Sequence, residues 1–249
     1  MKRTGIKKVV VLGATSGIAQ PLLRMMARDG KELLLVARSQ ERLDAVRSDL
    51  LARGAANVLT VDADLVISQE LVVSFAKECF PDFDTLLLTY GTMLDQALCQ
   101  VSPEDAVREL ETNFVSAVAV LTRFVGYFES RRSGTIAVIT SVAGERGRRP
   151  NYVYGAAKGG LSIFLQGLRS RMHRSGVRVV TIKPGPVATA MTANRPKVPL
   201  LASPELVSAN IYRALEHSGA EVVYVPPPWR WIMEAVRMVP ERVFKRLSV

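Results

Sequence analysis

Short runs of apolar residues alternate with longer segments of mixed character along most of the chain. Lys8–Leu12 reads Lys-Val-Val-Val-Leu and Glu32–Ala37 reads Glu-Leu-Leu-Leu-Val-Ala. A run of about four to eight apolar residues is typical of a strand that a parallel sheet buries on both faces. The pattern predicts strands at residues 8–12, 32–37, 58–62, 84–90, 134–140, 177–183 and 221–225.

Helices are predicted between these strands, and capping residues mark several of their ends. Ser68 and Ser102 each precede a helical segment as an N-cap, and Pro103 follows in the first turn of the second. Gly30 and Gly176 follow helical segments and fit their C-terminal caps. Strands and helices therefore alternate, with no internal repeat and no linker between domains.

This alternation predicts an α/β fold, a single-domain doubly wound (Rossmann) parallel sheet of about seven strands with helices on both faces. A chain of 249 residues suits one such domain. We assign residues 1–228 to this domain, with the cofactor and catalytic sites together, and residues 229–249 to an amphipathic, basic helical tail. Residues 192–202 are polar and spaced by prolines, so we expect a mobile segment beside the site.

Several residues suited to chemistry lie just where the predicted strands end. In a doubly wound sheet, ligands bind outside the carboxyl ends of the strands. The residues at these ends are Gly13, Arg38, Asp64, Gly91, Ser141 and the pair Pro184-Gly185. Their shared placement predicts one site along this edge of the sheet.

A glycine turn joins the first strand to the first helix, from Gly13 to Ala19. A strand, a glycine turn and a helix form the setting of a dinucleotide site, where pyrophosphate binds the free N–H groups of the helix start. Gly13 permits the tight turn, and Gly17 lets the backbone approach the pyrophosphate. The alternative is an ordinary strand-to-helix turn.

Arg38 follows the second strand, where an NAD enzyme usually carries a carboxylate for the adenosine ribose hydroxyl. A guanidinium at that place suits a 2′-phosphate, through a charge-assisted bidentate contact. The sequence therefore favours NADP(H) as the cofactor, with NAD(H) as the alternative.

Tyr154 and Lys158 are four residues apart on a predicted helix and share one face of it. A free phenol has a pKa near ~10, and a cation within about 4–6 Å lowers that pKa by favouring the phenolate. Such a tyrosine can exchange a proton with a hydroxyl or carbonyl oxygen, and Ser141 can approach from a neighbouring strand end. The alternative is a half-buried tyrosine beside a solvated lysine. Asn113, in a long predicted helical stretch, is a further polar candidate, and the alternative there is a surface amide.

The net charge of +10 favours an anionic partner. Candidates are the cofactor, a phosphorylated substrate or an anionic membrane surface; the alternative is a basic surface that serves only solubility. No nucleic acid partner is predicted, because no basic run is interleaved with aromatic residues. His173 and His217 are the only histidines, so we expect no multi-histidine metal site. Cys79 and Cys99 lack metal-ligand spacing and read as buried thiols of a reducing compartment, and no apolar stretch approaches a membrane span; we expect a cytoplasmic protein.

Taken together, these residues resemble the classical short-chain dehydrogenase/reductase (SDR) family over nearly the whole chain. The matching signatures are Gly13 and Gly17, Asp64, Asn113, Ser141, Tyr154 with Lys158, and Pro184-Gly185-x-Val187-x-Thr189. The resemblance implies that Tyr154 donates the proton in reduction, that Ser141 holds the substrate oxygen and that Asn113 anchors a water in a proton relay. Lys158 would lower the pKa of Tyr154 and bind the nicotinamide ribose, and the subunits would form homodimers or homotetramers.

The same resemblance implies a set of cofactor-binding residues along this edge. They are Gly13, Thr15, Ser16, Gly17, Ile18, Arg38, Asp64, Leu65, Gly91, Tyr154, Lys158, Pro184, Gly185, Val187 and Thr189. Two departures stand out: Leu12 and Ala19 replace the usual Thr and third Gly of the turn, and Thr89-Tyr90-Gly91 replaces Asn-Ala-Gly. These changes affect packing and nicotinamide contacts near Gly91 and leave the catalytic set intact.

The C-terminal tail follows Pro226-Pro227-Pro228 and repeats apolar residues mostly at three- and four-residue steps. Those residues are Trp229, Ile232, Met233, Val236, Val239, Val243, Phe244 and Leu247; the basic residues between them are Arg230, Arg237, Arg242, Lys245 and Arg246. Pro240 should divide the tail into two short amphipathic pieces. Such a segment suits either a helix lying in the interface of an anionic membrane or one packed on the domain or a neighbouring subunit.

The tail, the Tyr-Gly-Ala-Ala-Lys helix and the Pro-Gly-Pro-Val-Ala-Thr segment look like those of decaprenylphosphoryl-2-keto-ribose (D-erythro-pentofuranosid-2-ulose) reductases. This closer resemblance implies an NADP(H)-dependent reduction of a keto-sugar linked to polyprenyl phosphate, at the inner face of a membrane. Arg146, Arg148 and Arg149 would then contact phosphate, or else form a solvated loop. The alternatives are the same chemistry on a soluble ketone, alcohol or acyl-carrier-protein thioester, and a non-catalytic dinucleotide-binding regulator.

Overall fold

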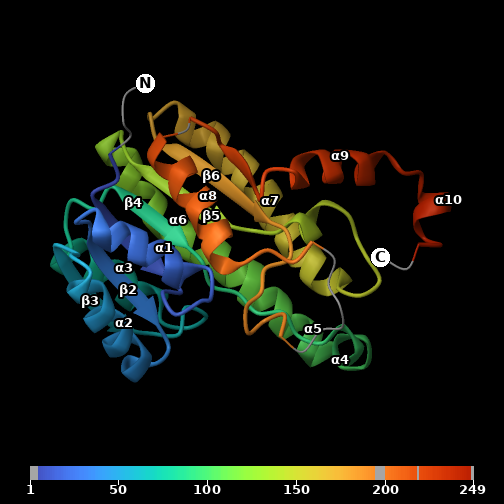
Figure 1. Cartoon of the computed structure of the whole chain (residues 1–249), viewed down its shortest axis with the longest axis horizontal. Helices are drawn as coiled ribbons and strands as arrows, with labels where there is room; N and C mark the ends of the chain where they lie inside the picture. The colour runs from blue at the N-terminus through green and yellow to red at the C-terminus, as the bar shows by residue number, and fades with distance from the viewer. Residues whose placement is uncertain (1–4, 194–199, 218, 248–249) are drawn as a thin grey trace.

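The computed structural model describes residues 5–193, 200–217 and 219–247 and shows a twisted parallel sheet between two layers of helices (Figure 1). The strand order is β3-β2-β1-β4-β5-β6-β7. The first three strands are added from β1 toward one edge of the sheet, and β4 returns to the other side of β1, from which β5, β6 and β7 are added toward the opposite edge. The strands are β1 Lys8–Leu12, β2 Glu32–Ala37, β3 Asn57–Asp62, β4 Thr85–Leu88, β5 Thr135–Ile139, β6 Arg178–Pro184 and β7 Val222–Val225. This order confirms the predicted doubly wound fold.

Helices cover both faces of the sheet. They are α1 Ala19–Arg28, α2 Gln40–Ala52, α3 Gln69–Cys79, α4 Gln96–Val101, α5 Pro103–Leu110, α6 Ser116–Arg131, α7 Tyr152–His173, α8 Pro204–His217, α9 Trp229–Met238 and α10 Glu241–Phe244. Alternate strand residues point to opposite layers: Val9 and Val11 pack with α1, α2 and α8, whereas Val10 and Leu12 pack with α3, α6 and α7. Two buried cores result, which is why the strands read as continuous apolar runs.

Strand positions agree with the predictions to within two residues at each end, but some local expectations were wrong. Ser102 caps α5 by accepting a hydrogen bond from the Asp105 backbone (3.1 Å), as predicted. Ser68 makes no side-chain cap on α3: its backbone, with φ of −106° and ψ of 30°, is not in the extended conformation typical of an N-cap. Cys79 is exposed rather than buried. The short helix α4 and a 3-10 turn, η2 (Val142–Glu145), were not predicted.

Two further predictions concern the segment after β6 and the tail. Residues 194–199 of the expected mobile segment lie outside the described residues. The tail forms α9 and α10 on either side of Pro240, as predicted, and extends from the end of β7 beyond the helical layers (Figure 1). Within the described part of the chain, no helix is long and apolar enough to cross a membrane.

Candidate active site

Ser141 and Tyr154 come from two segments whose backbones touch. Ser141 directly follows the buried Thr140 at the end of β5 and begins η2, where its Oγ accepts a hydrogen bond from the Ala143 backbone N–H (3.1 Å). The first turns of α7 pack on η2 through glycines: a Cβ on Gly144 would lie 2.5 Å from the Gly159 nitrogen. Ser141 therefore lies on the turn that packs against the helix carrying Tyr154 and Lys158.

Lys158 is buried in this contact, with 3% of its surface exposed. Burial lowers the pKa of its ammonium group to about 8, an effect that the Glu109 carboxylate opposes. The Nζ atom lies 5.7 Å from the centre of the Tyr154 ring and beside the bare backbone of Gly91, where a Cβ would be 3.0 Å from it. The predicted Tyr154–Lys158 pair is thus assembled on one helix face, and Lys158 is not the solvated lysine of the alternative reading.

Asn113 is buried in a π-helical turn, η1 (Glu111–Val115), between α5 and α6. Its Nδ2 donates to the Glu109 carbonyl (3.1 Å), the group that the backbone N–H of Asn113 would bind in a regular α-helix. Its Oδ1 accepts from the Thr92 backbone (3.2 Å) and lies beside Gly91, close to where Lys158 Nζ arrives. Single π turns frequently occur at functional sites, and the surface-amide reading of Asn113 is wrong.

The glycine turn after β1 is tight and packs closely on two neighbouring segments. Gly13 has φ of +95°, and a side chain there would collide with the Tyr90 backbone. Gly17 lies against Thr189, whose Cγ2 would be 2.7 Å from a Cβ at that position. Thr15, Ser16 and Ile18 complete the turn before α1, and Ser16 Oγ accepts from the Ala19 backbone (3.2 Å). The turn and the Pro184–Thr189 segment therefore meet, although they are far apart in the sequence.

Thr89 explains one departure from the family pattern. Its Oγ1 contacts the carbonyls of Leu12 (3.1 Å) and Gly13 (2.8 Å), so it ties the end of β4 to the start of the glycine turn. Thr89 is buried and next to Tyr90, against which Gly13 packs. The threonine thus supplies a donor that fastens this turn to the neighbouring strand end.

The residues predicted to meet the adenosine half of the cofactor lie at the ends of β2 and β3. Arg38 is exposed directly after β2. Arg42, which the sequence reading missed, extends its Nη2 toward the Thr15 carbonyl (3.5 Å) from the first turn of α2. Asp64 Oδ1 accepts from the Val66 backbone (2.9 Å), and the Leu65 side chain belongs to the core. Val187 is also a core residue. At Leu65 and Val187, it is therefore mainly the backbone groups that are available to a cofactor.

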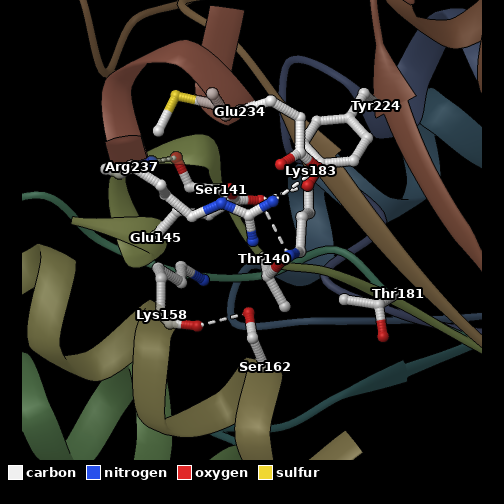
Figure 2. A network of polar contacts seen from close by, with 12 residues as sticks. Thr140, Ser141, Glu145, Lys158, Ser162, Thr181, Lys183, Tyr224, Glu234 and Arg237 are labelled. Carbon is white, nitrogen blue, oxygen red and sulfur yellow. Dashed lines mark hydrogen bonds and ion pairs between the residues drawn. The ribbon is translucent and has the colours of Figure 1, made fainter. Parts of the chain in front are cut away.

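A second polar cluster, centred on Glu145 of η2, lies next to Ser141 and was not predicted (Figure 2). The Glu145 carboxylate is buried; its Oε1 binds Lys183 Nζ (2.8 Å) and accepts from the Tyr224 hydroxyl (2.6 Å). Burial raises the pKa of Tyr224, so the phenol keeps the proton that it donates. Arg237 of α9 approaches Oε2 at 3.8 Å. We call these four residues the Glu145 cluster; it joins η2, β6, β7 and the tail.

The tail also packs directly on the signature segments. The Trp229 indole covers Gly185, where any side chain would collide with the ring. Met233 and Trp229 pack on Val142, one residue after Ser141. The tail therefore packs on the domain through one face, and it covers two segments at the carboxyl edge of the sheet, η2 and Pro184-Gly185.

The three loop arginines differ in their surroundings. Arg146 Nη1 donates to the carbonyls of Val236 (2.6 Å) and Val239 (2.5 Å), its Nη2 pairs with Glu241 (3.0 Å), and its guanidinium stacks on Phe244. Arg148 is partly buried and lies 3.2 Å from the Met233 sulfur, and Arg149 is exposed. Arg146 thus anchors the end of α9 and the start of α10, a role that neither sequence reading foresaw.

Comparison with known proteins agrees with the family resemblance seen in the sequence. The family model described as short chain dehydrogenase matches residues 7–199. An uncharacterized oxidoreductase of Mycobacterium tuberculosis is 37% identical over 250 residues, which cover 99% of both chains. A short chain dehydrogenase from Burkholderia cenocepacia in complex with NADP has a TM-score of 0.81 at 21% identity, covering 99% of this chain and 100% of its own. Actinorhodin polyketide ketoreductase with NADPH has a TM-score of 0.79 at 22% identity, covering 89% and 97%.

Proposed function

Because the chain belongs to the short chain dehydrogenase family and is an NAD(P)-dependent oxidoreductase, we propose that it reduces a ketone to a secondary alcohol with NADPH. One observation carries the proposal: Lys158 is buried beside Gly91, one helical turn from Tyr154, at the sheet edge that also holds the glycine turn. A structural role alone does not call for a buried lysine without a close carboxylate.

Tyr154 is the proton donor in this proposal. Ser141 Oγ already accepts a hydrogen bond from Ala143, which leaves its own proton to donate to the ketone oxygen. The Lys158 ammonium stabilises the phenolate that remains after Tyr154 has given up its proton. Bound NADPH supplies the hydride, and the protein orients it.

The experiment is an NADPH oxidation assay on soluble ketones and on lipid-linked keto-sugars. Tyr154→Phe should reduce turnover at least ~100-fold, since general acid catalysis is typically worth that much, while NADPH affinity stays unchanged. Tyr152→Phe is the matched control, because Tyr152 is an exposed phenol at the start of the same helix. Equal turnover in Tyr154→Phe would overturn the mechanism, and cofactor binding without turnover of any ketone would favour the regulator alternative.

We further propose that Arg38 and Arg42 hold the 2′-phosphate of NADPH. Both guanidinium groups are at the end of β2 and the start of α2, next to the glycine turn, and the B. cenocepacia structure, which shares the fold, contains NADP. Arg38→Asp should reverse the ratio of kcat/KM for NADPH to that for NADH. An unchanged ratio in Arg38→Asp and in the double variant with Arg42→Ser would contradict this assignment.

The finer substrate proposal is a keto-sugar linked to polyprenyl phosphate, reached at the inner face of an anionic membrane. The support is the tail: Trp231 and Met238 are 71% and 82% exposed on α9, and the tail also exposes the basic residues Arg230, Arg242 and Lys245. Because the opposite face of α9 packs beside Ser141 and Gly185, a tail lying in a bilayer would bring the catalytic edge close to the lipid headgroups. Homodimer or homotetramer formation stays a prediction.

Vesicle sedimentation tests the membrane contact. The double variant Trp231→Ser, Met238→Ser retains the buried Trp229 and Met233, so it should stay folded while losing binding to phosphatidylglycerol vesicles. The matched control is Ile67→Ser, which removes an 82% exposed apolar residue from the loop before α3. If the double variant sediments as the wild type does, the tail is not the membrane contact.

A further inference from the structure

Glu109 is a buried carboxylate close to the catalytic centre that none of the sequence signatures includes. It lies on α5, immediately before the π turn, and 1% of its surface is exposed. Its Oε2 accepts hydrogen bonds from Thr92 Oγ1 (2.8 Å) and the Leu94 backbone N–H (3.2 Å). Its Oε1 is buried and has no hydrogen-bond partner among the residues that the structure describes. Burying a carboxylate with incomplete hydrogen bonding costs stability, so its place in the fold calls for a reason.

The first reason is the orientation of Asn113. The Thr92 hydroxyl gives its proton to Glu109, so the same oxygen can only accept from Asn113, whose Nδ2 lies 3.2 Å away. Nδ2 also donates to the Thr92 carbonyl (3.1 Å). The amide nitrogen is thereby held toward Thr92, and Oδ1 is held toward Gly91 and the Lys158 side of the turn. The Glu109 carboxylate, acting through the Thr92 hydroxyl, therefore adds to the backbone contacts that set which end of the amide faces Lys158.

The second reason is the charge of Lys158. No carboxylate oxygen in the described residues lies within ion-pair distance (4.0 Å) of its Nζ. Glu109 and Lys158 approach the same short segment from two helices: Glu109 Oε2 binds Thr92, and Lys158 Nζ lies beside the neighbouring Gly91. The Glu109 carboxylate raises the pKa of the Lys158 ammonium and so opposes the effect of burial. A carboxylate that lies farther than 4.0 Å away favours the charged ammonium without forming a direct salt bridge with it. The hydrogen-bond donors of Lys158 therefore stay available for a ligand and for Tyr154.

We propose that Glu109 is a positioning residue of this catalytic centre, which orients the Asn113 amide through Thr92 and serves as the remote counter-charge of Lys158. The role rests on the proposed reductase function, because both of its targets belong to the proposed catalytic set. Glu109 itself touches neither substrate nor cofactor; it sets the state of the groups that do.

Two variants separate its two effects. Glu109→Gln removes the charge and lets the Thr92 hydroxyl point either way, so kcat should fall about tenfold or more and the alkaline limb of the kcat profile should move to lower pH. Thr92→Val removes the hydroxyl that links Glu109 to Asn113 but keeps the charge and the backbone contacts, so kcat should fall while the limb stays in place. Thr92→Ser restores the hydroxyl and should restore kcat. Glu104→Gln, an exposed charge removal on the same helix, is the control.

A titration without cofactor or turnover keeps this proposal separate from the proposed function. The ¹³Cε signal of Lys158 in lysine-labelled protein, assigned with Lys158→Arg, should titrate at lower pH in Glu109→Gln than in the wild type and in Glu104→Gln. A shift without any measurable reductase activity would support the counter-charge and contradict only the reductase function. An unchanged Lys158 titration in folded Glu109→Gln, together with kcat equal to that of Glu104→Gln, would overturn the proposal.

Discussion

Among the described residues, two lysines are buried at the carboxyl edge of the sheet, Lys158 on α7 and Lys183 on β6, and their surroundings differ. Lys183 contacts the buried Glu145 carboxylate at 2.8 Å, and Tyr224 donates to the same oxygen. Lys158 has no carboxylate that close among the described residues, and burial lowers its pKa to about 8. Figure 2 shows both side chains in one view. A dashed line connects Lys183 to Glu145, and no dashed line connects the ammonium of Lys158 to any of the drawn residues.

The difference is the one expected between a lysine that serves structure and a lysine that serves chemistry, the role that we propose for Lys158. A buried ion pair in direct contact neutralises its charges and fixes the segments that carry them, here η2 and β6. A buried ammonium without such a contact keeps unused hydrogen-bond donors and a pKa near neutrality, both of which suit proton transfer. The four predictions below test this contrast, from the largest expected effect to the smallest.

Replacing Lys158 with Met should have the largest effect on activity. We expect kcat to fall at least ~100-fold, as for the loss of a group that supports general acid catalysis. The free energy of unfolding should stay the same or rise, because a buried charge without a contact ion pair is removed. Steady-state NADPH oxidation and urea unfolding measure the two quantities; a clear loss of stability would make Lys158 a structural lysine.

Replacing Lys183 with Met should have its main effect on stability. It leaves the Glu145 carboxylate buried without its closest cation, so we expect the free energy of unfolding to fall by about 3 kcal/mol. The double variant Glu145→Leu, Lys183→Met should recover most of the loss, because it removes the stranded charge. Urea unfolding of both single variants and the double variant gives the coupling; additive losses would mean that the two side chains do not act as a pair.

The pH dependence of kcat should follow Lys158. Below about pH 8 its amine is protonated and supports the Tyr154 phenolate; above that pH the charge is lost. The rate of reduction should therefore fall as pH rises past about 8, approaching a tenfold loss per unit. The double variant Glu145→Leu, Lys183→Met should show the same fall in rate above about pH 8. A rate that stays flat up to pH 10 would show that another group controls the profile.

Arg237→Ala should have the smallest effect. Arg237 is 3.8 Å from Glu145, and its side chain is 43% exposed, so solvent screens the pair. We expect a loss below about 1 kcal/mol in the free energy of unfolding and little change in kcat. A loss as large as that of Lys183→Met would mean that the tail, rather than β6, holds Glu145 in place.

The same contrast shows how much the sequence could reveal. The strands were predictable because a sheet buried on both faces demands apolar runs, and the placement of Tyr154 and Lys158 on one helix face was predictable from their spacing. The π turn at Asn113 was not, since it arises from a shifted backbone hydrogen bond. Glu145 and Glu109 read as ordinary charged residues, and only the folded chain shows which partners, far away in the sequence, surround them.

The contact between Trp229 and Gly185 has a consequence for biosynthesis. A ribosome releases the N-terminal part of a chain first, and the glycine turn, Ser141 and Tyr154 all emerge well before the tail. Until residues 229–237 have left the exit tunnel, Gly185 stays uncovered and the Glu145 cluster lacks its arginine. This face of the nascent protein is therefore completed only after α9 has been synthesised, later than the segments that α9 covers.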